Sequence, residues 1–341
     1  MTTSRSLRAD APVRTRRRIR PVLWFAAVGV VCTACALFAW TAWIVTGHAV
    51  PTPTGPTPVP LAHRIGAWVI QGMSVILIIW GVVHAVRQCR QQRRITYDAL
   101  VLIGGTSIAW LEPYMNFFRP AAETYNSYHF NLGSWGPYLP GFLNDENFRE
   151  PLPLIYELCY GSYFLLLAMF GCKVMERCAR RWPHMSGAGL IGCTFAVFMV
   201  IEPFADNAYV RLHFYQYWHA IPELTLWSGE TYQYPVYAAV LASAYFTSLG
   251  ALRYFRDGHG HTLGERGVDE SARSPLRPAV LRLLGVTGCL NLAFGAYIFL
   301  YAWISVYGGP IPGDPPSYML NGVCGAGAEQ PCSVSNVPIT R

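Results

Sequence analysis

Residues 108–120 read Ile-Ala-Trp-Leu-Glu-Pro-Tyr-Met-Asn-Phe-Phe-Arg-Pro, and they place a carboxylate, Glu112, beside a proline at the end of a long apolar run. An ionised carboxylate in the hydrocarbon core of a bilayer costs roughly 2.5–3.5 kcal/mol on insertion scales. Glu112 is therefore expected to face other helices or a wet cavity, where an acid is by default a candidate functional residue. The pattern returns in residues 201–207, Ile-Glu-Pro-Phe-Ala-Asp-Asn, where Glu202 again precedes a proline at the end of an apolar run.

The composition of the 341-residue chain is that of a membrane protein. Hydrophobic residues make up 52% and charged residues 13% of it, whereas about 25% of residues are charged in ordinary globular proteins. Seven segments have the roughly 20 apolar residues that a membrane-spanning helix needs. They lie near residues 22–45, 66–86, 99–118, 153–172, 187–205, 235–252 and 280–307. The sequence therefore predicts an all-α fold, a polytopic membrane helical bundle of about seven transmembrane helices in the cell membrane.

The distribution of lysine and arginine predicts the orientation of this bundle. With the N-terminus on the inner side, 21 of the 26 Lys and Arg residues fall in inner segments. The outer segments keep Arg64, Arg119, Arg149, Arg211 and Arg341. The positive-inside rule then favours an N-in/C-out arrangement. The net charge of +7 is mostly this bias, which favours contact with anionic membrane lipid over binding to nucleic acid.

The predicted organisation has three parts. Residues 1–20 form an arginine-rich leader that is expected to be disordered and cytoplasmic, residues 21–307 form a single transmembrane domain, and residues 308–341 form an extracytoplasmic tail. The first apolar run is longer than the roughly 7–15 residues of a signal-peptide core, which indicates an uncleaved first helix. In the tail, Cys324 and Cys332 would face an oxidising exterior, where a local disulfide is favoured.

Two predicted outer loops, residues 119–152 and 206–234, are rich in aromatic and turn-forming residues. Loops this long without evident regular structure are often functional, although Trp and Tyr also gather at membrane surfaces without a functional reason. When the two Glu-Pro pairs are aligned, the third and fourth predicted helices (near residues 99–118 and 153–172) match the fifth and sixth (near residues 187–205 and 235–252). This match suggests an internal repeat. An approximate two-fold axis would bring both acidic helix ends to one outer vestibule, and chance similarity of two helix ends is the alternative.

The polar residues at these helix ends have the chemistry of general acid catalysis. On an α-helix, Glu112 shares a face with Asn116, as Glu202 does with Asp206. Burial raises the pKa of a carboxyl group and a second carboxylate raises it further, which leaves a neutral acid that can donate a proton. Glu157 adds a third acid on the same side, one turn inside helix 4. The alternative is that these residues only cap kinked helices and hydrogen-bond the backbone that proline frees.

Further candidates come from the aromatic loops. His129, His213 and His219 are candidate bases, and the alternative is that they bind zinc together with Asp206. His213 and His219 are six residues apart and lack the spacing of a helical metal pair, so no metal is expected. The candidate substrate-binding residues are Asn116, Trp110, Tyr114, Trp135, Tyr138, Asn207, His213 and Trp218. The aromatic faces among them would stabilise a cation and exclude water, or would serve only as interface anchors.

Four stretches carry a more specific signal. They are His63-Arg-Ile-Gly-Ala-Trp-Val69, Arg93-Arg-Ile-Thr-Tyr-Asp98, Glu112-Pro-Tyr-Met-Asn116 followed by Arg119-Pro120, and Ser134-Trp-Gly-Pro-Tyr-Leu-Pro-Gly141. Together they resemble the AveC-like spirocyclase family, over about residues 22–320. The resemblance implies a multi-pass actinobacterial membrane protein of polyketide antibiotic biosynthesis. Such a protein closes a lipophilic dihydroxyketone macrolactone (a macrolide) to a spiroketal, and some members also dehydrate it.

Spiroketal formation needs an acid, a base and a shaped apolar cavity. It needs no redox cofactor, and the sequence has no nucleotide-binding glycine pattern, so no cofactor is expected. Two other functions stay open at this point. One is a terpene-type membrane cyclase, which would protonate an epoxide or olefin. The other is a seven-helix transporter or sensor, in which Glu112, Glu202 and Asp206 would bind a proton or cation.

Overall fold

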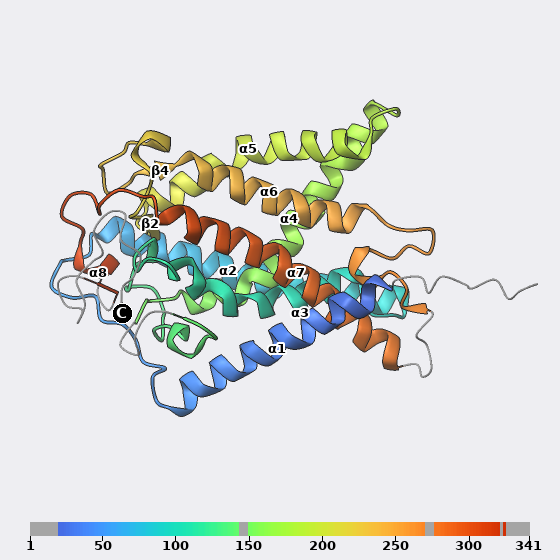
Figure 1. The fold of residues 1–341 in the computed structure, drawn as a ribbon, viewed down its shortest axis with the longest axis horizontal. Helices are drawn as coiled ribbons and strands as arrows, with labels where there is room; N and C mark the ends of the chain where they lie inside the picture. Colours follow the sequence, from blue (N-terminus) through green and yellow to red (C-terminus); the bar gives the residue numbers. More distant parts are fainter. Residues whose placement is uncertain (1–19, 143–148, 270–275, 321–322, 325–341) are drawn as a thin grey trace, which may run out of the picture.

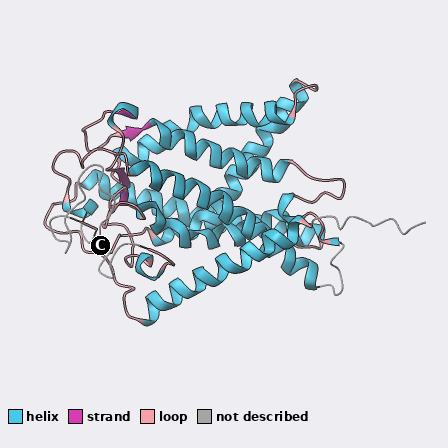
Figure 2. Ribbon diagram, in the orientation of Figure 1, coloured by secondary structure: helices cyan, strands magenta, loops and turns pink. Residues whose placement is uncertain are grey.

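The computed structural model of the protein describes residues 20–142, 149–269, 276–320 and 323–324. Its helices run between two ends of one bundle (Figure 1), and the few strands lie at one of these ends (Figure 2). The helices are α1 (Pro21–Val45), α2 (Leu61–Gln92), α3 (Tyr97–Ser107), α4 (Leu154–Arg181), α5 (Gly187–Arg211), α6 (Val236–Tyr254), α7 (Leu276–Ser305) and the short α8 (Ser317–Leu320). The predicted all-α membrane bundle is thus confirmed.

Six of the helices are long and apolar enough to cross a membrane, namely α1, α2, α4, α5, α6 and α7. The predicted third span, residues 99–118, differs from them. Its α-helix, α3, ends at Ser107 and continues as a 3₁₀-helix, η1 (Ile108–Asn116), which contains Pro113. Runs of 3₁₀-helix longer than three or four residues are uncommon, and they often mark strain or a functional hinge. The segment predicted as the third span is therefore built differently from the six candidate spans, and among the described residues six of the seven predicted spans are found as long apolar helices.

The strands lie at the end of the bundle where α1, η1, α5 and α7 finish, which is at the left in Figure 1. We call the described residues of the connections 117–153, 212–235 and 306–320 the cap. In the cap, β1 (Glu123–Tyr125) pairs antiparallel with β2 (Tyr215–Tyr217), and β3 (Thr225–Leu226) pairs antiparallel with β4 (Tyr234–Pro235). Three single turns of 3₁₀-helix complete the fold, η2 (Gly136–Tyr138), η3 (Pro222–Leu224) and η4 (Leu263–Glu265). A backbone ladder thus joins the two aromatic loops.

The chain after α7 packs onto this ladder. The Thr124 hydroxyl donates a hydrogen bond to the Met319 carbonyl at 2.8 Å, and the Ser127 amide donates to the Tyr318 carbonyl at 2.8 Å. Farther along, Cys324 is disulfide-bonded, and its predicted partner, Cys332, lies outside the described residues. The tail therefore fixes the position of β1 from the side opposite the helices.

Glycines let two pairs of helices approach closely. A Cβ on Gly29 of α1 would lie 2.1 Å from the Leu284 carbonyl oxygen of α7, so only glycine fits there. A Cβ on Gly250 of α6 would lie 2.9 Å from the Cα of Gly171 in α4. Small residues of this kind are the usual contact points between membrane helices, because the helices have no hydrophobic driving force for association in lipid. The bundle is therefore closed between its first and last long helices, and α4 is held against α6.

Candidate active site

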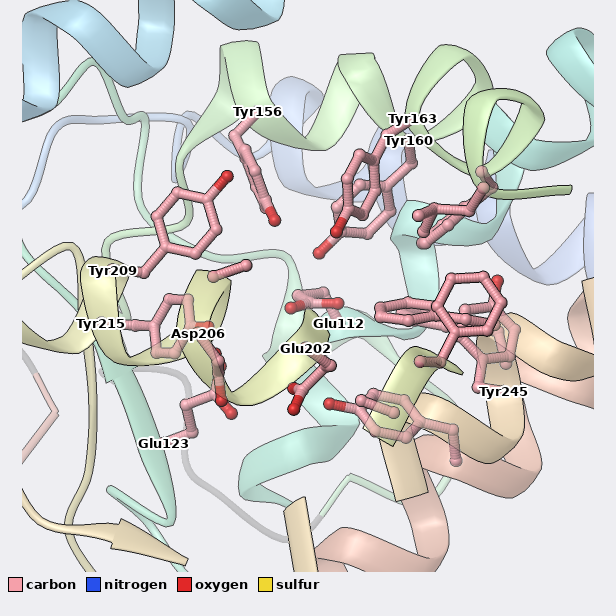
Figure 3. Close-up of a pocket in the computed structure, with 18 of the residues that line it drawn as sticks. Glu112, Glu123, Tyr156, Tyr160, Tyr163, Glu202, Asp206, Tyr209, Tyr215 and Tyr245 are labelled. Carbon is pink, nitrogen blue, oxygen red and sulfur yellow. The ribbon is translucent and has the colours of Figure 1, made fainter. Parts of the chain in front are cut away.

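A cavity of about 450 Å³ lies beneath the β1–β2 pair, between η1, α4, α5, α6 and α7. This volume is within the roughly 300–1,000 Å³ of typical small-molecule sites. Four carboxyl groups line it, those of Glu112, Glu123, Glu202 and Asp206, and Figure 3 shows them facing one another. The lining also contains the tyrosines Tyr125, Tyr156, Tyr160, Tyr163, Tyr209, Tyr215, Tyr217, Tyr245 and Tyr297. Among the described residues that line the cavity, none is Lys, Arg or His.

The 3₁₀ conformation of η1 decides which of its side chains reach the cavity. In a 3₁₀-helix, residues three apart are eclipsed, whereas in an α-helix residues three and four apart share a face. Glu112 and Met115 accordingly line the cavity together, and Asn116 does not. The Asn116 amide instead donates hydrogen bonds at 2.8 Å to the Glu123 carbonyl and to Oε1 of Glu150. The predicted pairing of Glu112 with Asn116 on one face is therefore wrong, because it assumed an α-helix.

Glu112 is held by a tyrosine hydroxyl. The Tyr125 hydroxyl donates to Oε1 of Glu112 at 2.6 Å, and Tyr160 of α4 lines the same cavity. The Glu112 side chain is buried. Since Tyr125 belongs to β1, the cap fixes the position of the Glu112 carboxyl group on η1.

Glu202 and Asp206 lie one turn apart on α5, as the sequence predicts for an α-helix, and both line the cavity. The Tyr234 hydroxyl donates to Oε2 of Glu202 at 2.8 Å, and the Tyr217 hydroxyl donates to Oδ2 of Asp206 at 2.9 Å. The two carboxyl groups lie beside each other on one face of α5 and both reach the cavity. Two neighbouring buried carboxyl groups favour holding one proton between them over carrying two charges, so this pair can both donate and accept a proton.

The β1–β2 pair forms the roof of the cavity. Its register sets Glu123 opposite Tyr217 and Tyr125 opposite Tyr215, and because strand side chains alternate, all four point to the same face. All four line the cavity. Thr124, between Glu123 and Tyr125, points the other way and accepts a hydrogen bond from the Trp218 indole at 2.7 Å. Because side chains alternate along the strands, the carboxyl and phenol groups of both loops face one site.

Glu123 and Glu150 add buried acids that sequence reasoning missed. Both side chains are buried in the cap region. Burial raises the pKa of Glu123 well above its usual range, and the charges of Glu112, Asp206 and Glu150 raise it further. Burial likewise raises the pKa of Glu150, and the charge of Glu112 adds to this effect. These carboxyl groups therefore favour the neutral form, in which a carboxylic acid donates a proton.

Two predicted catalytic residues lie outside the cavity lining. Glu157, in the first turn of α4, is buried one turn from Tyr160. His129 is buried in the cap, where its Nδ1 lies 2.8 Å from Oδ1 of Asn126 and its Nε2 lies 3.0 Å from the Pro151 carbonyl oxygen. Both ring nitrogens are engaged in holding the cap, so His129 is placed as a structural residue. A role for Glu157 in catalysis would have to act through its neighbours.

The predicted aromatic contacts near Glu112 also point away from the cavity. The Trp110 indole donates to Oδ1 of Asn291 at 2.7 Å, and the Trp135 indole donates to the Trp110 carbonyl at 3.1 Å. The Tyr114 hydroxyl donates to the Pro140 carbonyl at 2.8 Å. These side chains fasten η1 and the cap to the bundle. They are amphipathic anchors within the protein.

The remaining predicted binding residues are likewise engaged elsewhere. The Tyr138 hydroxyl is hydrogen-bonded to Nδ1 of His48, and the Asn207 amide donates to the Pro203 carbonyl at 2.7 Å. Trp218 lies above the roof and is fully buried. The His213 ring packs on that of His63, with 4.2 Å between their centroids. None of these four predicted residues lines the cavity.

The histidines of the cap do not gather with acids. The His219 Nδ1 lies 2.8 Å from the Gly309 carbonyl oxygen, and burial lowers the pKa of His219 to about 4. Among the described residues, no group of three or more His, Cys, Asp or Glu side chains is arranged to hold a metal ion.

The tyrosines are the main feature that sequence reasoning did not assign to the site. Tyr156, Tyr160 and Tyr163 are spaced four and three apart at the start of α4, which on an α-helix sets them on one face. All three line the cavity, and Figure 3 shows their rings at one side of it. This spacing was a signal in the sequence, but it is also the pattern of an aromatic belt at a membrane interface.

Comparison with known proteins gives one match. A family described as "Spirocyclase AveC-like" matches residues 92–318 of the chain. The matched range contains every residue that lines the cavity. No curated protein and no solved structure matches the chain.

Proposed function

Because this chain belongs to the AveC-like spirocyclase family, we propose that it closes a dihydroxyketone polyketide to a spiroketal with loss of water. The reaction takes place in the cavity of carboxyl groups and tyrosines. One observation carries this proposal: the acids of two helix ends that are ninety residues apart in the chain, Glu112 and Glu202 with Asp206, line one cavity that has no cationic side chain among its described residues. A site of this composition suits proton transfer to and from an uncharged, lipophilic substrate.

The reaction needs a proton to be delivered and taken up in turn. One substrate hydroxyl adds to the ketone carbon and forms a C–O bond, its proton passing to a carboxylate while a carboxylic acid protonates the ketone oxygen. The hydroxyl group of the resulting hemiketal is then protonated. Its C–O bond breaks, water departs, and an oxocarbenium ion remains. The second hydroxyl attacks this cation and returns a proton to the site. The net change is the loss of one water.

Glu112 on η1 and the Glu202–Asp206 pair on α5 supply the acid and the base on opposite sides of the reacting carbon. Because two neighbouring carboxyl groups readily hold one proton between them, the pair can give up a proton in one step and take one back in a later step, which restores its charge at the end of the cycle. A correctly positioned acid or base typically contributes about 10²–10⁴-fold to the rate. The hydrogen bonds from Tyr125, Tyr217 and Tyr234 keep these carboxyl groups in place.

The tyrosine rings support the cationic step. Aromatic faces attract a cation by about 0.5–2 kcal/mol, more when the contact is dry. Trp110, Trp135 and Trp218 were expected in this role but lie outside the cavity lining, whereas nine tyrosines are part of it. Their rings also keep bulk water from the oxocarbenium ion, which would otherwise be hydrolysed back to the hemiketal.

The experiment is a stereochemical assay of the reconstituted protein with a dihydroxyketone substrate. Spiroketals also form spontaneously in acid, so both the rate and the ratio of stereoisomers are followed. Glu112→Gln and Glu202→Gln should lower the rate about 10²–10⁴-fold, while Glu223→Gln, at an exposed position of the cap, should not change it. Wild-type rate and selectivity in both cavity variants would refute the proposal. Proton flux into vesicles without formation of any product would also refute the proposal, and it would indicate that the protein is a transporter. Mass analysis of the products also detects loss of a second water, which is the additional dehydratase step.

We further propose that the bundle lies in the cell membrane with the cap outside and the N-terminus inside. The Lys and Arg distribution supports this orientation, and so does the disulfide-bonded state of Cys324, because disulfides persist in oxidising compartments. After reduction, a membrane-impermeant thiol reagent applied to intact cells should label the tail cysteines, Cys324 and its predicted partner Cys332. Labelling of Cys89 or Cys178, at the other end of the bundle, without labelling of either tail cysteine would reverse the orientation.

A further inference from the structure

Part of the cavity wall is exposed on the outside of the bundle. Three residues that line the cavity, Ile201 of α5 and Leu166 and Phe170 of α4, have 46%, 41% and 36% of their surface exposed. Ala205, one turn after Ile201, also lines the cavity and is exposed. Both helices are long and apolar enough to cross a membrane, so these exposed apolar side chains face lipid. The cavity therefore opens sideways, between α4 and α5.

One contact between aromatic rings of α4 and α5 lies on each side of this opening. Toward the cap, Tyr156 of α4 and Tyr209 of α5 pack with 6.3 Å between ring centroids, and both appear at one edge of the cavity in Figure 3. On the other side, Phe170 of α4 and Phe198 of α5 pack edge to face at 5.5 Å. We call the opening between these two ring pairs the window.

The window lies deep in the membrane-crossing part of the helices. Ile201 is ten residues before the end of α5 at Arg211, and Leu166 is twelve residues after the start of α4 at Leu154. At 1.5 Å per residue these positions lie about 15 and 18 Å from the cap end of their helices. The hydrocarbon core is about 30 Å thick, so the window faces lipid tails and is far from the head groups.

The arrangement of the helices accounts for a gap at this place. A short turn, residues 182–186, joins α4 to α5, and in Figure 1 the two helices meet at this turn while α4 runs obliquely to α5 from there. The close contact of Gly171 with Gly250 holds α4 against α6. α4 therefore packs tightly against α6 on one side, and on its other side it diverges from α5 toward the cap.

We propose that the substrate enters the cavity sideways from the lipid through the window, and that the apolar remainder of a bound substrate stays in the window against lipid. This inference rests on the proposed function, because it assumes a lipophilic substrate. The hydroxyketone segment then lies among Glu112, Glu202 and Asp206, and the rest of the molecule is never transferred to water. The length of the apolar remainder is accordingly limited by the membrane and not by the cavity volume of about 450 Å³.

The first test needs no substrate. Ala242 of α6 is buried and lines the cavity, so Ala242→Cys reports how a reagent reaches the interior. In vesicles, a small maleimide dissolved in the bilayer should label Ala242→Cys above the wild-type background. Adding Ile201→Trp should suppress that labelling, whereas Val200→Trp should not, because Val200 is 64% exposed but does not line the cavity. Labelling by a charged, water-soluble reagent from the cap side, unaffected by Ile201→Trp, would overturn the proposal.

The second test uses two substrates, a dihydroxyketone with its full apolar remainder and a truncated one without it. Ile201→Trp should lower kcat/KM for the full substrate by roughly tenfold or more relative to its effect on the truncated substrate, which corresponds to about 1.4 kcal/mol. Val200→Trp should change neither. Equal loss with both substrates, or no loss with either, would mean that the apolar remainder does not occupy the window, and either result overturns the proposal. If the wild type converts neither substrate, the proposed function fails, and the labelling result still decides whether the window gives access to the cavity.

Discussion

Glu123 and Tyr217 lie directly opposite each other across the β1–β2 pair, and both side chains point down into the cavity. This pairing joins two segments that each follow a Glu-Pro helix end. It predicts that Thr124→Cys and Gln216→Cys, the neighbouring register pair on the upper face, form a disulfide, since opposite Cβ atoms in such pairs are about 4.5–5.5 Å apart. With a protease site inserted in the turn at residues 182–186, the two halves should stay linked after cleavage until they are reduced. Separation of the halves without reductant, as expected for either single cysteine, would contradict the pairing.

The hydroxyl groups of Tyr125 and Tyr217 should matter because they position carboxyl groups. Tyr125→Phe and Tyr217→Phe each remove one hydrogen bond, whose net value of about 0.5–1.5 kcal/mol corresponds to a loss of roughly 2- to 13-fold. We expect this loss in kcat, with little change in KM. The matched control is Tyr245→Phe, because Tyr245 lines the same cavity but its buried hydroxyl has no hydrogen-bond partner among the described residues. Steady-state kinetics decide the point, and an equal loss in Tyr245→Phe would indicate direct contact with substrate instead.

The buried acids of the cap should make stability depend on pH in one direction. Burial, with nearby carboxylates, raises the pKa of Glu123 and Glu150 in the folded chain. Their contribution to stability is then complete below the unfolded pKa of about 4.5 and is lost as the pH rises through the folded value. The thermal midpoint in detergent should therefore fall as the pH rises above about 4.5, and it should fall less in Glu123→Gln. Glu223→Gln, which is exposed, should follow the wild type, and identical falls in all three proteins would refute this assignment.

The contact between α4 and α6 predicts a position-dependent effect of adding side-chain volume. Gly250→Val would press its Cβ against Gly171 at 2.9 Å, and overpacking of this kind typically costs about 1–3 kcal/mol. Gly72→Val is the matched control, because a Cβ there meets no atom within 4 Å. Thermal unfolding in detergent should show a lower midpoint for Gly250→Val alone. Similar midpoints for the two variants would mean that α4 and α6 are not packed as described.

Much of the fold was predictable because apolar length alone indicates a membrane-crossing helix. The acids of the site were predictable for a related reason, since Glu112, Glu202 and Asp206 interrupt apolar runs where a charge is costly. The structure of the predicted third span was not predictable in detail. Hydrophobicity predicts that a segment such as residues 108–116 is buried, but it does not distinguish an α-helix from a 3₁₀-helix, and this difference put Met115 in the cavity in place of Asn116.

The roof of the cavity was harder to predict than its walls. Glu123 and Tyr125 occur in a loop of mixed composition, and a strand of three residues is too short to show a period of two. Only pairing with β2 makes their alternation visible, and that partner is about ninety residues away. Trp110, Trp135 and Trp218 were assigned to the site because large aromatic residues suit both a binding pocket and a protein interior, and the sequence contains nothing that separates the two.

The close contact of α1 with α7 at Gly29 and Leu284 has a consequence for biosynthesis. The first helix leaves the ribosome long before its partner exists, because Gly29 and Leu284 are 255 positions apart in the chain, from 284 − 29. At about 5–20 residues per second, this interval is roughly 13 to 51 s. During that time, the glycine-bearing face of α1 has only lipid, or an insertion factor of the cell, to pack against. A nascent chain arrested before α7 should therefore hold α1 in an accessible state, and synthesis of the last helix should bury it.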